Sequence, residues 1–565
     1  MLNLNDQERE RAEAVDVILG SSSRHKVIVA GPGTGKTFLF KKICENTSGD
    51  TLAITFINNL ANDLKYDLDE LAECCTFHAL CKKLIYSLPV PPIDKFLYFP
   101  KIEAVINSDR GILEPSLDQA KDAFEEFLRD DARISFFLKR ARYYKAVGHT
   151  DGVYQVTQFL TENPHLTPVF SQILVDEYQD FNKLEISMIE VLGRASPTLI
   201  VGDDDQALYD FKRASPSFLR SAARDGGSEL FQLPYCSRCT EVIVNAVNDI
   251  IATAKSVGLL RDRLDKPFKC FLPGKIDDNA RFPKIIYAKC SVQQKIAPYM
   301  SRYIVSEIEG IVGAGYRPDY NSGVWDFIIA GPGYYLRGLE DILKPNFPNT
   351  FQSGPEPSEL MPEDGYLELL RDIDSDIGWR AVLNFCKPET FEDAIRSSKS
   401  MVHPVRGYIP ENVQENVLNT IAILSKLKSG EGIDTFEETR LLEVIGSNGL
   451  DTIRSIFAGG IPKPDSDADK PGHRIRISTI LGCKGLTANF VFLVGLNDGV
   501  LPKHQGAPDD YEVCKFIVGL TRARKKCYLI SVRNLFGQWM EESPFIKWLD
   551  SSYLEEIYVD KKYFV

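Results

Sequence analysis

The stretch KVIVAGPGTGKT, residues 26–37, constrains this chain more than any other, because it combines a strand, a glycine-rich loop and a helix start. The β-branched run from Val27 to Ala30 is typical of a buried central strand. Gly31 to Gly35 then forms the loop, and Lys36 and Thr37 open a helical pattern. This is the spacing of a phosphate-binding loop, with Ala30 replacing its first glycine. In such loops backbone N–H groups surround phosphate oxygens and the lysine reaches the β- and γ-phosphates. The sequence therefore predicts a nucleotide site.

Two acidic turns follow apolar runs further along the chain. Asp176 and Glu177 come directly after a run ending at Val175, and DDDQ, residues 203–206, follows the run from Pro197 to Gly202. The carboxyl ends of parallel strands share one edge of a sheet, so we expect these turns beside the phosphate-binding loop. In that position Asp176 would bind Mg²⁺ together with Thr37, and Glu177 would orient and deprotonate the attacking water.

Composition limits the class of protein. A chain of 565 residues is too long for one hydrophobic core, and its alternating strands and helices predict doubly wound parallel sheets. A net charge of −13 excludes a histone-like or coat function and restricts any nucleic-acid contact to a local groove. The twelve cysteines lack the spacing of a disulfide framework or a zinc site. With neither a secretory signal nor a membrane-spanning run, we expect a cytoplasmic protein with no membrane association.

Six motifs follow one another along the chain: GPGTGKT, DEYQD, GDDDQALYDF, LPYCSRCT (233–240), RIRISTILGCKGL (474–486) and VGLTRAR (518–524). In this order they resemble the motifs of the UvrD/Rep-type superfamily 1 DNA helicases of the 3′-to-5′ branch. The resemblance covers nearly the whole chain. It implies two RecA-like P-loop NTPase domains with helical insertions, which hold ATP and Mg²⁺ in a shared cleft.

The expected boundaries follow from these motifs and from changes in composition. They are 1–90 and 166–232 for the first RecA-like domain, 91–165 for a helical insertion, 233–370 and 473–565 for the second RecA-like domain, and 371–472 for a second, short helical insertion. The basic and aromatic segment from Lys139 to Lys145 suits either a nucleic-acid contact or a solvated helix face.

The resemblance also implies roles for single residues. The catalytic set is Lys36, Glu177, Gln206 as the γ-phosphate sensor, and Arg238 and Arg522 as arginine fingers. The nucleotide-binding set is Gln7 for adenine, Gly31, Gly33, Thr34, Gly35, Lys36, Thr37, Arg238, Gly485 and Arg522, and the metal ligands are Thr37 and Asp176. The residues expected to contact DNA are Phe56, Asn58, Thr76, Phe77, His78, Tyr209, Phe211 and Thr479.

The expected activity is ATP-dependent 3′-to-5′ translocation on single-stranded DNA and unwinding at single-strand/duplex junctions, in DNA repair or antiphage defence. Ser237, Leu481 and Thr487 depart from the family pattern, where Tyr, His and Glu are usual. These departures and the short second insertion keep an alternative open. In it, the chain is a nucleotide-sensing ATPase subunit that regulates a separate partner nuclease, as in Gabija-type defence, with little unwinding of its own.

Overall fold

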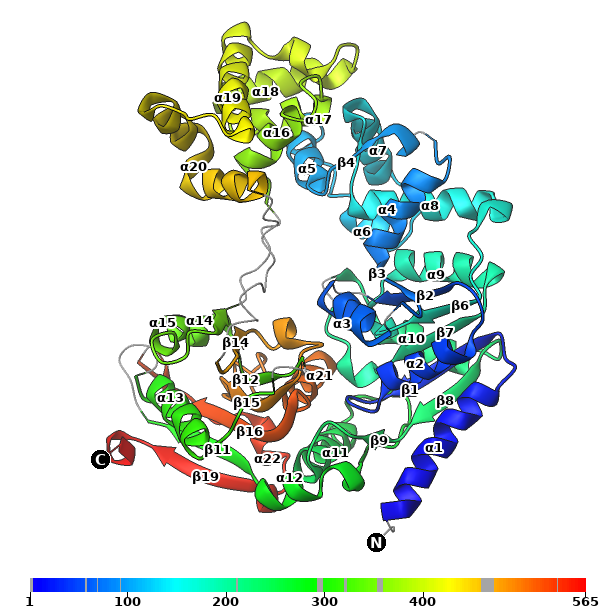
Figure 1. Ribbon diagram of the computed structural model, residues 1–565, viewed down its shortest axis with the longest axis vertical. Helices are drawn as coiled ribbons and strands as arrows, with labels where there is room; N and C mark the ends of the chain where they lie inside the picture. The colour runs from blue at the N-terminus through cyan, green and yellow to red at the C-terminus, as the bar shows by residue number, and fades with distance from the viewer. Residues whose placement is uncertain are drawn as a thin grey trace.

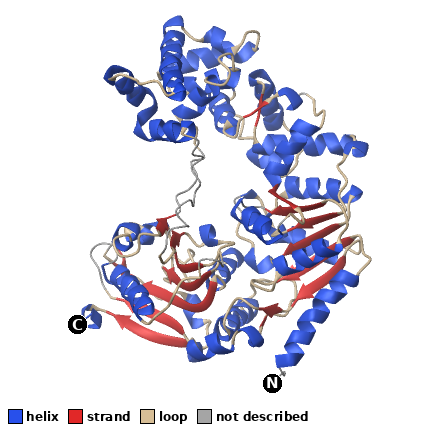
Figure 2. Cartoon of the chain, in the orientation of Figure 1, coloured by secondary structure: helices blue, strands red, loops and turns tan. Residues whose placement is uncertain are grey.

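The computed structural model describes residues 4–55, 58–68, 70–91, 93–209, 212–291, 298–319, 323–352, 359–458, 472–535 and 537–564. Two parallel sheets form the lower part of the molecule as drawn, and helices dominate the upper part (Figures 1 and 2). This arrangement confirms the predicted fold class of two RecA-like α/β units with additional helices.

The first sheet has six strands and carries the phosphate-binding loop. In spatial order they are β3 (Glu73–Thr76), β2 (Thr51–Thr55), β6 (Gln172–Val175), β7 (Thr198–Gly202), β1 (His25–Ala30) and β8 (Glu229–Leu233). All neighbouring strands are parallel. The carboxyl ends of β1, β6 and β7 therefore lie side by side, and the loops that follow them meet at one edge, as the sequence predicted.

Helices cover both faces of this sheet. They are α1 (Leu4–Gly20), α2 (Lys36–Asn46) and α3 (Asn58–Leu68) on one face, and α4 (Phe77–Ser87), α9 (Lys183–Ala195) and α10 (Pro216–Arg224) on the other. Alternate residues of β1 enter the two cores, Ile28 on the α2 side and Val27 and Val29 on the α9 side. Because both faces are buried, the strands are apolar throughout, which is why they could be recognised from sequence.

The second sheet has seven parallel strands. In order they are β13 (Thr350–Gln352), β14 (Ile475–Ser478), β12 (Trp325–Ala330), β15 (Ala488–Val494), β16 (Ala523–Val532), β11 (Ile285–Cys290) and β19 (Leu554–Val559). Its two faces are covered by α11 (Glu241–Ser256), α21 (Asp510–Leu520) and α22 (Pro544–Lys547), and by α13 (Pro298–Gly313), α14 (Gly333–Leu336) and α15 (Leu339–Leu343).

The chain passes from the first sheet to the second directly after β8. There the short strand β9 (Tyr235–Cys236) pairs in parallel with β10 (Lys269–Cys270), and α12 (Ile276–Arg281) precedes β11. This connection places residues 236–239 next to the phosphate-binding loop. The second unit therefore contacts the first at the edge of the sheet that carries this loop.

The remaining helices come from two distant parts of the sequence and share one hydrophobic core (Figure 1). They are α5 (Ile102–Leu113), α6 (Lys121–Glu125), α7 (Ala132–Tyr144) and α8 (His149–Glu162), and α16 (Pro362–Leu369), α17 (Asp376–Leu383), α18 (Pro388–Ser397), α19 (Glu411–Ser429) and α20 (Thr435–Phe457). The helix α16 packs against α17 and α20, although the sequence analysis assigned its residues to the second RecA-like domain. Two-residue strands complete the fold: β4 (Leu97–Tyr98) with β5 (Ala146–Val147), and β17 (Asn534–Leu535) with β18 (Gln538–Trp539).

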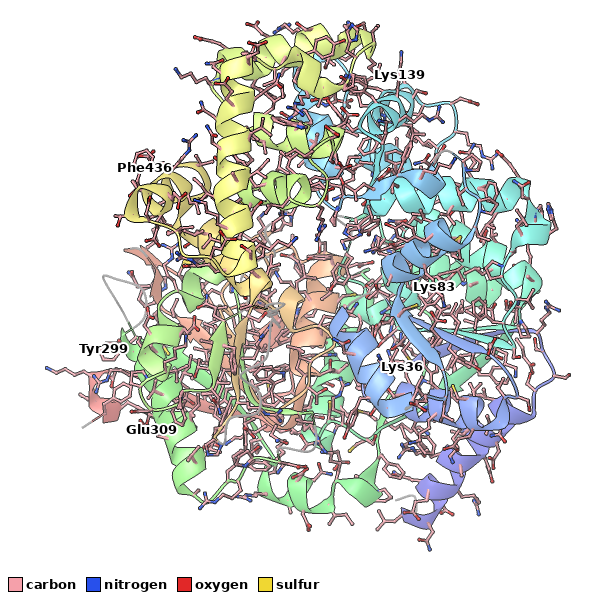
Figure 3. All side chains as sticks on the ribbon, turned by 45° about the horizontal axis from the view of Figure 1, so that its top comes forward. Lys36, Lys83, Lys139, Tyr299, Glu309 and Phe436 are labelled. Atoms are coloured by element: carbon pink, nitrogen blue, oxygen red, sulfur yellow. The ribbon has the colours of Figure 1, made fainter. Side chains whose placement is uncertain are left out.

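A buried carboxylate joins these two helical groups. Asp109 of α5 accepts hydrogen bonds from Arg140 Nε of α7 and Arg380 Nε of α17, each at 2.7 Å, and all three side chains are at most 2% exposed. Tyr144 donates to the same carboxylate at 2.5 Å. Arg140 and Tyr144 therefore face the core, whereas Lys139 lies on the exposed side of α7 (Figure 3). Neither sequence interpretation of the 139–145 segment anticipated this inward-facing network.

None of the helices in the described part of the chain combines the length and the apolar character needed to cross a bilayer.

Candidate nucleotide site and adjoining cavity

A cavity of about 380 Å³ lies where the two sheet-bearing units meet. The first unit lines it with residues 32–37, Asp176, Glu177 and Gln206, and the second with Ser237, Arg238, Gly485, Thr487, Arg522 and Arg524. Lys36, at the start of α2, lines this cavity. The three loops that follow β1, β6 and β7 thus converge with both predicted arginine fingers.

The phosphate-binding loop depends on glycine at two positions. Gly33 has φ +68° and Gly35 has φ +92°, values that residues with a Cβ rarely adopt. A Cβ on Gly33 would also lie 2.3 Å from the Cβ of Arg238, because the Ser237 N–H donates to the Gly33 carbonyl at 2.9 Å. Gly33 therefore permits both the turn of the loop and the close approach of the second unit.

Lys36 and Glu177 form an ion pair inside the cavity. The Lys36 Nζ lies 3.2 Å from Glu177 Oε1, and Gln179 Nε2 donates to Glu177 Oε2 at 2.6 Å. Burial raises the pKa of Glu177, but the charges of Lys36 and Lys484 and the Gln179 hydrogen bond outweigh it and lower the pKa. Glu177 has φ +54°, a strained value for a residue with a side chain, and such strain is common at functional sites.

Arg522 and Gln206 bridge the cavity from opposite units. Arg522 Nη2 donates to Gln206 Oε1 at 2.8 Å, and Arg522 Nε donates to the Val518 carbonyl at 3.0 Å. Burial, followed by the charge of Arg238, lowers the pKa of Arg522 to about 10, so the guanidinium stays charged at neutral pH. Lys484 adds a second bridge, since its Nζ contacts Asp180 Oδ2 at 2.5 Å and the Gln206 carbonyl.

Thr37 and Asp176 line the same cavity as the loop lysine. Burial, opposed by the Lys36 charge and reinforced by that of Glu177, raises the pKa of Asp176. One hydroxyl and one carboxylate suit Mg²⁺, which prefers oxygen ligands and usually takes its remaining ligands from phosphates and water. The residues at this place therefore fit the predicted metal.

Two residues predicted to bind nucleotide lie outside the lining of this cavity. Gln7 is 6% exposed, and its side-chain oxygen accepts from the Leu272 N–H of the second unit at 2.9 Å. Gly31 is buried at the start of the loop, where its carbonyl accepts from the Thr34 hydroxyl at 2.9 Å. Their roles stay predictions.

A larger cavity, of about 800 Å³, adjoins the first sheet on the side of the upper helices. Thr76, His78 and Tyr209 line it, together with basic and acidic side chains from α4, α6, α8 and α9. Burial, with smaller effects from His149 and Lys212, lowers the pKa of His78 to about 3, so this ring is neutral at physiological pH. Lys484 lies 5.3 Å from the centre of the Tyr209 ring, which connects this cavity to the nucleotide cavity.

The other predicted DNA contacts are placed differently. Phe77 is 1% exposed and packs 5.8 Å from Phe181, ring centre to ring centre, so it belongs to the core and offers no face to a strand. We therefore no longer assign Phe77 to DNA. Thr479 is exposed, and its hydroxyl accepts from the Gly482 N–H at 3.0 Å. Phe56, Phe211 and the side chain of Asn58 lie outside the described residues.

Sequence reasoning gave no role to Arg524, which lines the cavity, or to Gln179 and Lys484, which bind residues of the lining. Gln179 joins two loops of the first unit, because its amide nitrogen binds Glu177 and its amide oxygen accepts from the Asp203 N–H at 2.9 Å. Lys484 bridges the two units. Both were visible in the quoted DEYQD and KGL motifs, but spacing alone does not show which side chains of a motif turn toward a partner.

The fold and the convergence of these loops define a two-unit P-loop nucleotide-binding protein. Residues 113–226 match the UvrD/REP helicase N-terminal domain, and residues 449–534 match the UvrD-like helicase C-terminal domain. Both matches confirm the resemblance of this chain to the UvrD/Rep-type superfamily 1 helicases.

Similar proteins carry helicase names. The chain is 23% identical to the ATP-dependent DNA helicase PcrA of Staphylococcus aureus, over 98% of this chain and 87% of that protein. It is 21% identical to the ATP-dependent DNA helicase Rep of Buchnera aphidicola, over 99% of both. With DNA helicase II of Haemophilus influenzae the identity is 24%, over 67% of this chain and 56% of that protein.

Proposed function

We propose that this protein is an ATP-dependent, Mg²⁺-dependent 3′-to-5′ single-stranded-DNA translocase and helicase. The observation that carries the proposal is the composite cavity, in which Lys36 and Glu177 of one unit face Arg238 and Arg522 of the other. A site assembled from two units hydrolyses ATP only when the units are together, and this requirement couples hydrolysis to their relative movement. The names of the similar proteins, which are ATP-dependent DNA helicases, support the same activity.

ATP binding would begin by breaking the Lys36–Glu177 ion pair. The γ-phosphate competes for the Lys36 ammonium, and the displaced Glu177 carboxylate is then free to accept a proton from water. Gln179 remains hydrogen-bonded to Glu177 and keeps it oriented. When bound, Mg²⁺ would neutralise phosphate charge beside Thr37 and Asp176. Arg238 and Arg522 would stabilise the charge that develops on the phosphate during transfer.

The cavity beside Thr76, His78 and Tyr209 is the proposed place for DNA bases. The His78 and Tyr209 rings in its lining suit stacking against unpaired bases, and stacking tolerates any base because every base has a π-face. Lys484 contacts both the Tyr209 ring and the Gln206 carbonyl, so a strand at Tyr209 and a phosphate at Gln206 would act on the same side chain.

A strand-displacement assay tests the proposal and its direction. We expect the purified chain to separate a duplex with a 3′ single-stranded tail when ATP and Mg²⁺ are present. A duplex with a 5′ tail, a blunt duplex and the Glu177→Gln protein serve as controls and should give no displacement. Displacement of the 5′-tailed substrate alone would contradict the direction. ATP hydrolysis without displacement of any substrate would instead favour the nucleotide-sensing subunit.

A further inference from the structure

Three consecutive carboxylates converge at the end of β7. Asp203, Asp204 and Asp205 are at most 3% exposed, and their oxygens lie within 4.8 Å of one another, a geometry that could hold a metal ion. The position between them is taken by the ammonium group of Lys266. Its Nζ lies 3.0 Å from Asp203, 2.5 Å from Asp204 and 2.9 Å from Asp205. The cluster is thus a buried ion network built around a lysine.

Lys266 reaches this cluster from the segment between α11 and β10, after the chain has left the first sheet. It is 7% exposed, so its charge is costly to bury without compensation. Asp204 also pairs with Arg220 at 3.0 Å, and Asp205 with Arg263 at 2.7 Å. For Asp203, Lys266 is the one cation within ion-pair distance in the described part of the chain.

Asp203 in turn orients Gln206. Asp203 Oδ2 accepts from Gln206 Nε2 at 2.5 Å, which leaves Gln206 Oε1 to accept from Arg522 Nη2 at 2.8 Å. An ionised carboxylate can only accept hydrogen bonds, and a guanidinium can only donate them. With the Asp203 carboxylate on one side and the Arg522 guanidinium on the other, the Gln206 amide has one orientation that satisfies both. If the Asp203 carboxylate moved away, Gln206 Nε2 would lose this acceptor and the amide would be free to turn its NH₂ toward Arg522, where two donors would face each other.

We propose that Lys266 is a positioning residue for ATP hydrolysis: its ammonium group holds the Asp203 carboxylate in place, and this carboxylate in turn fixes the Gln206 amide against Arg522. The inference rests on the proposed function, because Gln206 and Arg522 act there on the γ-phosphate. It adds a residue that no motif of the sequence analysis contained. Lys266 touches neither Gln206 nor the lining of the nucleotide cavity, so its effect passes through Asp203.

The first test is a kinetic cycle between Lys266 and Asp203. Lys266→Met should lower kcat for DNA-stimulated ATP hydrolysis by about tenfold or more and change KM for ATP by less than about twofold, as expected when an interaction made in the transition state is lost. Asp203→Asn keeps an oxygen that accepts from Gln206 and has no charge to balance. In that background Lys266→Met should therefore cost less than about threefold. An equal loss of kcat in the wild-type and Asp203→Asn backgrounds would overturn the proposal. Lys266→Arg keeps the positive charge and should retain most of the wild-type rate.

Lys289→Met is the matched control. Lys289 is 8% exposed and also pairs with two carboxylates, Glu542 at 3.0 Å and Glu556 at 2.9 Å, but it lies on β11 outside the nucleotide cavity. We expect this variant to lose stability and keep kcat. If it lowers kcat as much as Lys266→Met does, the effect is one of general destabilisation and the proposal is wrong.

A stability cycle separates this proposal from the proposed function. Lys266→Met, Gln206→Ala and the double variant are compared by urea denaturation, which needs no turnover. Because the Lys266 side chain acts on Gln206 through Asp203, the double variant should shift the urea midpoint by less than the sum of the two single shifts. Additive shifts would overturn the link even if the wild type is an active ATPase. If the shifts are coupled but the wild-type protein shows no ATPase activity, the link between Lys266 and Gln206 holds and the proposed function is wrong.

Discussion

Replacing Lys36 with alanine or Glu177 with glutamine should reduce ATP hydrolysis by orders of magnitude, for different reasons. Removing the Lys36 ammonium takes a positive charge from the phosphates, so nucleotide binding should weaken. Glu177→Gln leaves that charge in place and removes the base, which should cost about 10²–10⁴-fold in kcat. Steady-state ATPase rates, together with the affinity for a fluorescent ATP analogue, distinguish the two effects.

The ion pair between Lys36 and Glu177 leads to a specific prediction for the ATP affinity of Glu177→Gln. Because Lys36 lies 3.2 Å from Glu177, Glu177→Gln removes a group that competes with the phosphates for the lysine, and this variant should bind ATP at least as tightly as the wild type. Lys42→Ala is a suitable control, since Lys42 lies on the same helix and pairs only at the surface with Glu45. A Glu177→Gln protein that hydrolyses ATP at the wild-type rate would rule out Glu177 as the base.

Asp109→Asn should strongly destabilise the helical part of the molecule. It removes the carboxylate that pairs with both Arg140 and Arg380, and no other carboxylate among the described residues lies within ion-pair distance of these two buried guanidinium groups. Loss of one partner from a buried ion pair typically costs about 3–5 kcal/mol of unfolding free energy. Urea denaturation followed by circular dichroism measures the change.

Asp122→Asn provides the comparison. Asp122 pairs with Arg213, but both side chains are about half exposed, and exposed pairs contribute at most about 1 kcal/mol. Similar small losses for both variants would mean that the Asp109 network does not hold the two helical groups together.

The sheet edge where the loops after β1, β6 and β7 meet could be predicted from sequence, because each of these loops is recognised from a short local motif. The phosphate-binding loop, DEYQD and GDDDQ each follow an apolar strand, and parallel strands bring their carboxyl ends to one edge. The family resemblance, rather than this reasoning, implied that Arg522 joins the site, although Arg522 lies far from Lys36 in the sequence. The structure brings Arg522 to that cavity.

The parts that sequence missed depend on contacts between distant segments. Lys266 has no motif around it, and only the folded chain shows that it enters the aspartate cluster. Arg140 and Tyr144 lie in a basic and aromatic run that suggested a surface. Both side chains instead donate to the buried carboxylate of Asp109, which Arg380 also binds. Phe77 occupies a motif position but packs in the core. A pattern of residue types does not specify which side of a helix meets a partner from elsewhere in the chain.

If single-stranded DNA brings the two units together over ATP, the steady-state ATPase activity must depend on the concentration of single-stranded DNA. We expect the wild-type rate to rise strongly and to saturate with single-stranded DNA, and to rise much less with blunt duplex. Arg522→Ala should bind the same DNA and show almost no stimulation, because the guanidinium that meets Gln206 across the cavity is gone. A wild-type rate that does not respond to single-stranded DNA would contradict the motor and favour a nucleotide sensor.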